Sequence, residues 1–352
     1  MTLGPDGELL SQPQNIRELV AEGVLAEESG LDFFGLGEHH IAEMPLSAPD
    51  LVLAAIAART SRIHLGSAVT VLSSDDPVRV FQRYATLDAL SAGRAEVILG
   101  RGSSTESFPL FGFDLADYDR LFEEKLELFA RLRTEEPVTW SGTTRAALPG
   151  LDVYPRTAGG ALPTWVGVGG NPASVVRAAR HRFSLMLAII GGNPARFARL
   201  SALYRAATEQ SGIAPLPIGV HSPGHVAASD EQAKEEYWPT YQTFMLDARR
   251  QRGFPEITRD YFEHEVEYGS LYVGSPETVA RRIVKTMTAL DANRFDLKYG
   301  MGPMPHAALM ENSASSAPRS HHGCASNSSS GSGRLGLVLV IGRLRHAALS
   351  DR

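Results

Sequence analysis

Apolar and polar positions follow two alternating periods along most of the chain. Short apolar runs bounded by glycine or polar residues predict buried strands, and apolar residues three or four positions apart predict helices. The predicted strands are Leu31–Gly37, Ile63–Thr70, Arg94–Leu99, Thr164–Val168, Ser184–Ile190, Leu216–His221 and Arg294–Tyr299. The predicted helices cover about residues 16–28, 50–60, 77–92, 117–132, 172–181, 194–210, 230–252 and 276–290.

Strands that alternate with helices through short loops pair in parallel by right-handed crossovers. This order predicts an α/β fold, best described as a (β/α)8 TIM barrel whose first strand is missing or truncated, because residues 1–10 have a turn composition. An open doubly wound sheet is the alternative. In both folds the functional residues lie at the carboxyl ends of the strands.

Domain organisation is simple in this interpretation. Residues 1–311 form one barrel domain, with insertions near residues 133–162 and 226–270. The helical pattern ends after Met310, which predicts a degenerate last helix. Residues 312–352 are expected to be disordered, because Ser313–Ser332 contains nine serines and too little apolar surface to fold. A frameshift near the end of a GC-rich gene would explain this tail.

Composition narrows the class of protein. The 352 residues carry a net charge of −6, which argues against nucleic acid or an anionic membrane as partner. No apolar run approaches the length of a membrane span, and no secretory leader is recognisable. The one cysteine, Cys324, excludes a disulfide framework. We therefore expect a cytoplasmic protein.

Candidate catalytic residues follow the first predicted strand. Glu38, His39 and His40 stand where a barrel strand delivers its active-site side chains, and histidine exchanges protons near neutral pH. Adjacent histidines point in different directions and have no further ligand at metal spacing, so we predict no metal site. A polar cluster at a loop is the structural alternative.

Three further segments carry candidate binding residues. Ser74 and Asp75 follow the second predicted strand, as a helix cap or as a pocket wall. Arg101 lies between two glycines after the third, where it could grip a phosphate or be a surface residue in a turn. Finally, a glycine pair and a helix start could bind an anion, although plain capping is the alternative; its candidate residues are Gly169, Gly170, Asn171 and Ser174. The same Gly-Gly-Asn-Pro sequence recurs at Gly191–Pro194.

Taken in order, several segments resemble the luciferase-like flavin-dependent monooxygenases, the family of the bacterial luciferase α subunit. The segments cover most of residues 10–310 in the family's order: Gly30–Met44 (GLDFFGLGEHHIAEM), Ala68–Arg79 (AVTVLSSDDPVR), Leu87–Arg94, Gly100–Gly112 (GRGSSTESFPLFG), Thr164–Ala179 (TWVGVGGNPASVVRAA) and Tyr272–Ile283.

The resemblance implies a barrel that holds FMN at its C-terminal mouth. His39 aligns with the family's catalytic histidine, flanked by Glu38 and His40. Arg101 aligns with the arginine that binds the FMN phosphate, and residues 169–174 with the phosphate loop. Ser74–Asp75 falls where the family often has a non-prolyl cis peptide under the flavin ring.

The implied activity is that of a monooxygenase using reduced FMN and O2 on a small organic substrate. Electrons would come from a separate flavin reductase or from NAD(P)H, and a homo-oligomer is expected. Three alternatives stay open: deazaflavin-dependent hydride transfer, a flavin-binding protein without turnover, and a metal-dependent hydrolase using His39 and His40.

Overall fold

A computed structural model describes residues 2–315, apart from Pro5, Ser103, Ser104, Pro215, residues 253–255 and Met301. Most of the tail predicted to be disordered, residues 316–352, lies outside the described residues, so its expected disorder stays a prediction. In the described part of the chain, no helix combines the length and the apolar character needed to cross a membrane.

The core of the fold is a parallel sheet with the strand order β10-β9-β8-β7-β4-β3-β2, and β11 pairs with β9 beside β10. Its strands are β2 (Phe33–Leu36), β3 (His64–Val71), β4 (Ala95–Gly100), β7 (Thr164–Val168), β8 (Ser184–Ala188), β9 (Ile218–Val226), β10 (Tyr272–Gly274) and β11 (Arg294–Lys298). All seven predicted strands are present, and the three-residue β10 was missed.

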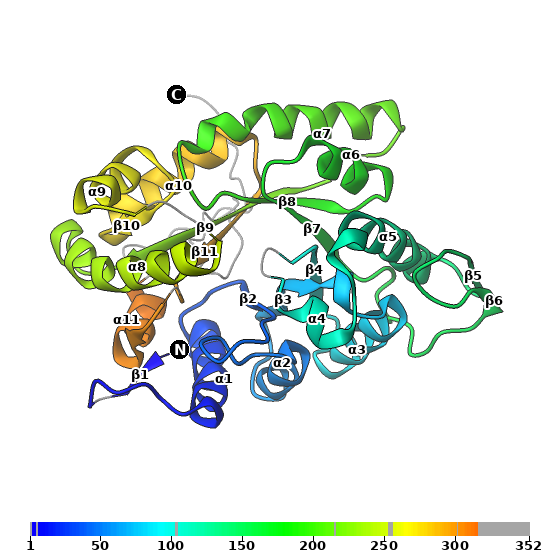
Figure 1. Cartoon of the computed structure of the whole chain (residues 1–352), viewed down its shortest axis with the longest axis horizontal. Helices are drawn as coiled ribbons and strands as arrows, with labels where there is room; N and C mark the ends of the chain where they lie inside the picture. The colour runs from blue at the N-terminus through cyan, green and yellow to red at the C-terminus, as the bar shows by residue number, and fades with distance from the viewer. Residues whose placement is uncertain are drawn as a thin grey trace, which may run out of the picture.

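Helices surround the outside of this curved sheet (Figure 1). In chain order they are α1 (Gln12–Glu28), α2 (Pro49–Ala57), α3 (Pro77–Leu90), α4 (Ser107–Phe111), α5 (Tyr118–Thr134), α6 (Pro172–Arg180), α7 (Ala198–Gln210), α8 (Asp230–Arg252), α9 (Arg259–Tyr268), α10 (Pro276–Leu290) and α11 (His306–Ser315), with short 3-10 turns at Leu72–Ser74, Leu115–Asp117 and Pro194–Phe197. The (β/α) barrel prediction is therefore confirmed, and the doubly wound alternative is not needed.

The barrel is open between β2 and β11, where the first barrel strand would stand. The chain instead begins with β1 (Thr2–Leu3), which pairs with β12 (Met304–Pro305) in a small separate sheet. The predicted truncation of the first strand is thus confirmed. The last helix, α11, packs against α1 and continues to Ser315, beyond the predicted end near Met310.

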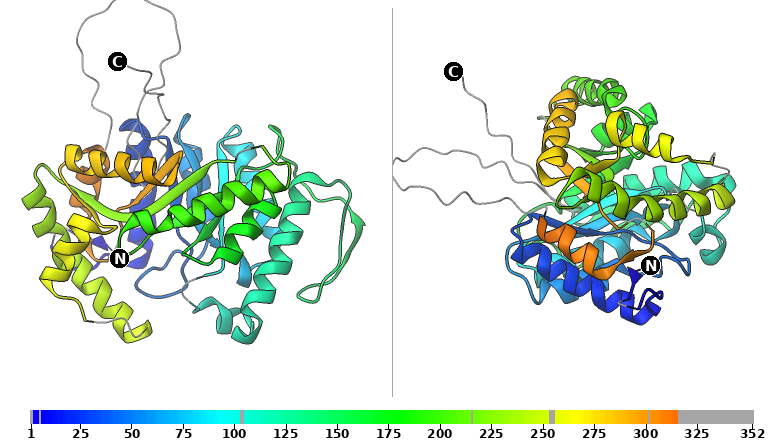
Figure 2. Two further views of the ribbon diagram at one scale, coloured as in Figure 1. Left: turned by 90° about the horizontal axis from the view of Figure 1, so that it is seen from above. Right: turned by 90° about the vertical axis from the view of Figure 1, so that its left-hand side faces the viewer.

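The two predicted insertions have different structures. The first contains an antiparallel hairpin, β5 (Val138–Trp140) and β6 (Leu148–Leu151), which stands at the outer edge of the molecule (Figure 2). The second contains α8, with the bounds expected from the sequence, and α9, which was not predicted.

A buried ion network spans the open side of the barrel. The Arg294 guanidinium on β11 donates to Asp296 (2.6 and 2.9 Å) and to Glu96 on β4 (2.7 Å). It also stacks over the Phe33 ring of β2, 4.0 Å from the centroid. Burial alone would lower the pKa of Arg294, but the two carboxylates raise that pKa above its ordinary value. All three charged side chains are almost fully buried.

Arg294→Met should therefore lower the free energy of unfolding by about 3–5 kcal/mol, because it leaves two carboxylates buried without their cation. The measurement is urea unfolding at pH 7, with Arg199→Met as the matched control, since Arg199 is exposed on α7. A loss below about 1 kcal/mol would show that the network does not stabilise the open barrel.

Candidate active site

The predicted site residues lie at the carboxyl ends of neighbouring strands. Glu38, His39 and His40 follow β2, Ser74 and Asp75 follow β3, Arg101 follows β4, and residues 169–174 follow β7. These four strands are adjacent in the sheet. The structure therefore brings the candidates to one edge of the sheet. They lie there in two places, some at the mouth of the barrel and some in a separate cavity beside the end of β2.

His39 belongs to the mouth of the barrel. Its Nδ1 lies 3.2 Å from Oε1 of Glu106, and both side chains are partly exposed. Glu106 lies in the segment Gly100–Gly112 but was not singled out from the sequence, because nothing in its spacing points to a histidine 67 residues away. A carboxylate on Nδ1 fixes the orientation of the imidazole and the nitrogen that carries the proton.

Glu38 and His40 point away from the mouth and form a buried pair. Oε1 of Glu38 lies 3.0 Å from Nε2 of His40, and Oε2 accepts the Val71 N–H at 2.9 Å. The edge of the His40 ring contacts the Phe111 ring. Burial is the largest influence on Glu38 and raises its pKa above the ordinary value, against the lowering effect of its hydrogen bonds.

The non-prolyl cis peptide bond lies at Ala68–Val69, so the expectation that it would fall at Ser74–Asp75 is wrong. The Val69 carbonyl accepts the N–H of Glu38 (3.1 Å), and the Val69 side chain fills the space that the Cβ atoms missing from Gly100 and Gly167 leave open. The sequence carries no proline there that could have marked the bond. Ser74 and Asp75 instead form the turn before α3, where Ser74 bonds to Ser107 (2.8 Å) and Asp75 pairs with Arg83.

Arg101 reaches across the rim of the mouth. Its guanidinium contacts Asp119 (2.5 Å) and lies over the Tyr118 ring. The Asp119 side chain is 81% exposed, so this ion pair contributes little and is readily exchanged for another anion.

The two Gly-Gly-Asn-Pro copies have the same caps but different surroundings. Asn171 caps α6 and Asn193 caps the turn before α7, each accepting a backbone N–H at 2.9 Å. A Cβ added at Gly169 or Gly170 would meet no atom within 4 Å, whereas one at Gly192 would touch Arg196. Only the first copy therefore leaves open space on both of its glycines. Ser174 is buried and accepts a hydrogen bond from Arg177 within α6.

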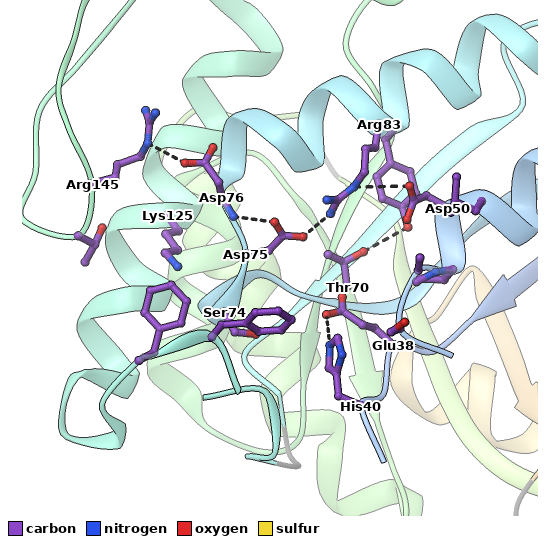
Figure 3. Close-up of a pocket in the computed structure, with 18 residues that line it drawn as sticks. Glu38, His40, Asp50, Thr70, Ser74, Asp75, Asp76, Arg83, Lys125 and Arg145 are labelled. Atoms are coloured by element: carbon purple, nitrogen blue, oxygen red, sulfur yellow. Dashed lines mark hydrogen bonds and ion pairs between the residues drawn. The ribbon is translucent and has the colours of Figure 1, made fainter. Parts of the chain in front are cut away.

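A cavity of about 470 Å³ lies on the other side of the β2 end (Figure 3). Of the predicted site residues, Glu38, His40, Ser74 and Asp75 line it. The sequence prediction missed Asp50, Arg83, Lys125 and Arg145, which come from four separate segments. Phe111 and Phe113 also line the cavity, whereas their neighbour Phe108 is a core residue.

A family model described as luciferase-like monooxygenase matches residues 1–292. The chain belongs to this family. A curated relative, 4-hydroxyprotoasukamycin monooxygenase of Streptomyces nodosus subsp. asukaensis, is 35% identical over 270 residues, which are 72% of this chain and 65% of that protein. The match thus spans slightly less than two thirds of the relative's own length.

Solved structures agree with this assignment. The monooxygenase RslO1 from Streptomyces bottropensis superposes with a TM-score of 0.76 at 26% identity, covering 90% of this chain and 94% of that one. Two others share the fold at lower identity. One is the oxygenating constituent of 3,6-diketocamphane monooxygenase from Pseudomonas putida in complex with FMN (TM-score 0.68, 18% identity, 90% and 96% covered). The other is the coenzyme F420 dependent tetrahydromethanopterin reductase of Methanopyrus kandleri (0.65, 17%, 90% and 96%).

The raised pKa of Glu38 predicts a pH-dependent stability difference between the parent protein and Glu38→Gln. In the unfolded chain the Glu38 carboxyl loses its proton near pH 4.5, and in the folded protein it does so only at higher pH. The parent should therefore lose stability relative to the variant as pH rises through this window, by about 1.4 kcal/mol per pH unit between the two pKa values.

Urea unfolding at pH 4, 6 and 8 measures this difference. Glu231→Gln, at an exposed position in the first turn of α8, is the control and should show none. A difference that stays constant over this range, or grows in the parent's favour, would mean that Glu38 ionises freely in the fold.

Proposed function

We propose that the protein is a monooxygenase that uses reduced FMN and O2 to oxidise a small organic substrate. The observation that carries the proposal is that three candidate groups lie at the same edge of the sheet. His39 follows β2, Arg101 follows β4 and the open start of α6 follows β7. These strands are consecutive in the sheet, with β3 between β2 and β4. Family membership and the FMN complex of a protein with the same fold support it.

The residues at the mouth fit a flavin phosphate. The backbone at Gly169 and Gly170 is open, and α6 directs its positive dipole end there. Arg101, whose present partner is an exposed carboxylate, would supply the charge-assisted contact. Asn171 already accepts the Ala173 N–H, so we assign it to holding the helix start in place, and Ser174 to packing beneath it.

When bound, reduced FMN supplies the electrons that activate O2. The protein's part is to orient the ring, to exclude water and to place a proton donor or acceptor. We assign the proton to His39, since the Glu106 carboxylate at Nδ1 orients an imidazole that can exchange protons near neutral pH. Val69 and the glycines around it give the mouth an apolar wall.

A second candidate is F420-dependent hydride transfer, which the fold neighbour from Methanopyrus kandleri favours. The remaining assignments accompany the main proposal: a flavin reductase or NAD(P)H as the electron source, a homo-oligomeric state, and a place in the cytoplasm. For the metal-dependent alternative, the described residues contain no group of three or more potential ligands.

Arg101→Ala should weaken FMN binding about 10- to 150-fold, because one charge-assisted contact to the phosphate is lost. Riboflavin, which lacks the phosphate, should bind equally to both proteins. Fluorescence titration measures both affinities. Arg131→Ala, an arginine on α5 whose partners are Glu127, Glu135 and the Thr139 carbonyl, is the control. Unchanged FMN affinity in Arg101→Ala would remove Arg101 as the anchor.

His39→Ala should leave FMN affinity within about threefold of the parent and reduce oxygenation about 10²- to 10⁴-fold, the usual loss when a general acid or base is removed. The measurement is oxygenation of the best substrate from a screen, with a flavin reductase, together with the peroxide released. His264→Ala, at an exposed position on α9, is the control. If oxygenation persists within a few-fold, His39 has no role in proton transfer.

A further inference from the structure

The cavity beside the mouth has the size and walls of a ligand pocket rather than of a packing defect. Its volume of about 470 Å³ lies within the range of small-molecule sites. Pro49 and Leu51 line one part at the start of α2, and Phe111 and Phe113 line another. Glu38 and His40, the two neighbours of His39, also line it, so the cavity adjoins the proposed flavin site.

The carboxylates of the cavity already have internal donors. Asp75 pairs with Arg83 and accepts the Asp76 N–H (2.7 Å), and Asp50 lies 3.6 Å from the same arginine. Asp76 caps α3 and accepts from Arg145 Nε at 2.9 Å. Glu38 is held by His40 and Val71. Figure 3 shows these pairs along the cavity wall. Because each carboxylate already has a donor within the protein, these acids stabilise the cavity wall and do not indicate a cationic ligand.

Lys125 and Arg145, by contrast, have donors for which the described residues supply no acceptor. Lys125 is 3% exposed, and its ammonium donates to the Ser73 carbonyl (2.6 Å) and lies 4.0 Å from the centre of the Phe113 ring. It forms no ion pair with any described carboxylate, although three donors are available on an ammonium. Nη1 of Arg145 is buried without a hydrogen-bond partner in the described part of the chain. Buried donors of this kind require an acceptor.

Burial also lowers the pKa of Lys125 to about 8, against the opposing effect of Asp75 and Asp76. The protein thus holds an ammonium under conditions that disfavour its charge. A bound anion would raise that pKa again and stabilise the charge, which gives the pocket a preference for a negative group over a neutral one.

We propose that this cavity is the substrate pocket and that it takes an organic carboxylate with an apolar body. Lys125 and Arg145 receive the carboxylate, and Phe111, Phe113 and Leu51 contact the apolar body. Calling the ligand a substrate rests on the proposed function. The preference for a carboxylate rests only on the residues that line the cavity. Lys125 and Arg145 are specificity residues in this assignment, because they contact the substrate and not the reacting atoms.

The probe is 2-naphthoate, with 2-naphthamide as its neutral isostere, titrated by calorimetry into the full-length protein with and without saturating FMN. We expect 2-naphthoate to bind in both states and 2-naphthamide to bind at least about tenfold more weakly. Lys125→Met and Arg145→Gln should each weaken 2-naphthoate about 10- to 150-fold. Lys285→Met, an exposed lysine on α10, is the matched control and should change nothing.

Two variants are used because Lys125 is buried, and Lys125→Met could lower stability; Arg145 is only partly buried. Equal affinity for the acid and the amide, or unchanged affinity in Arg145→Gln, overturns the proposal. Competition between 2-naphthoate and FMN also overturns it, since the cavity would then belong to the flavin. Failure of FMN to bind at all would instead refute the proposed function, and the 2-naphthoate result without FMN would still be readable.

Discussion

The Arg294 guanidinium joins three strands that are not direct neighbours in the described sheet. Its carboxylate partners are on β4 and β11, and the ring beneath it is on β2. A closed barrel would secure this side with a first strand between β2 and β11, but here the first strand has two residues and pairs elsewhere. The Arg294 side chain therefore links β11 to β2 and β4 by electrostatic contacts, whereas neighbouring strands of the sheet are linked by backbone hydrogen bonds.

Arg294 contacts the first residue of β2, Phe33, and the candidate site residues follow the other end of the same strand. Three consecutive polar residues leave the strand and point to different sides: His39 toward Glu106 at the mouth, and Glu38 and His40 into the adjoining cavity. His39, the residue proposed to transfer the proton, is thus flanked in sequence by two residues that line the proposed substrate pocket. A displacement of β2 within the sheet would move all three side chains together.

The strands and most helices could be predicted from the sequence because both faces of a parallel sheet are buried and its strands are continuous apolar runs. Short elements held by tertiary contacts, such as β10 and β1, have no such pattern. The positions of the candidate residues after β2, β4 and β7 could be predicted because functional residues lie at the carboxyl ends of the strands in this fold. Glu106 and Lys125 could not, since each acts through partners that are distant in sequence.

The repeated Gly-Gly-Asn-Pro sequence illustrates the same limit. Both copies cap a helix or turn in the same way, and their local sequences do not differ at those four positions. What separates them is the cover supplied by other side chains: Arg196 and Glu265 occupy the second copy, and the first is open. Local sequence predicts the cap, but only the assembled fold shows which cap is accessible to a ligand.

The purified protein is titrated anaerobically with reduced FMN and, separately, with reduced F420, and each complex is then mixed with oxygenated buffer. This measurement tests most directly whether the mouth binds reduced FMN for reaction with O2. If the mouth binds reduced FMN for this reaction, reduced FMN should bind at least about tenfold more tightly than reduced F420, and O2 should reoxidise the bound flavin at a rate different from that of the free flavin. Tighter binding of F420, with no effect of the protein on flavin reoxidation, would contradict it.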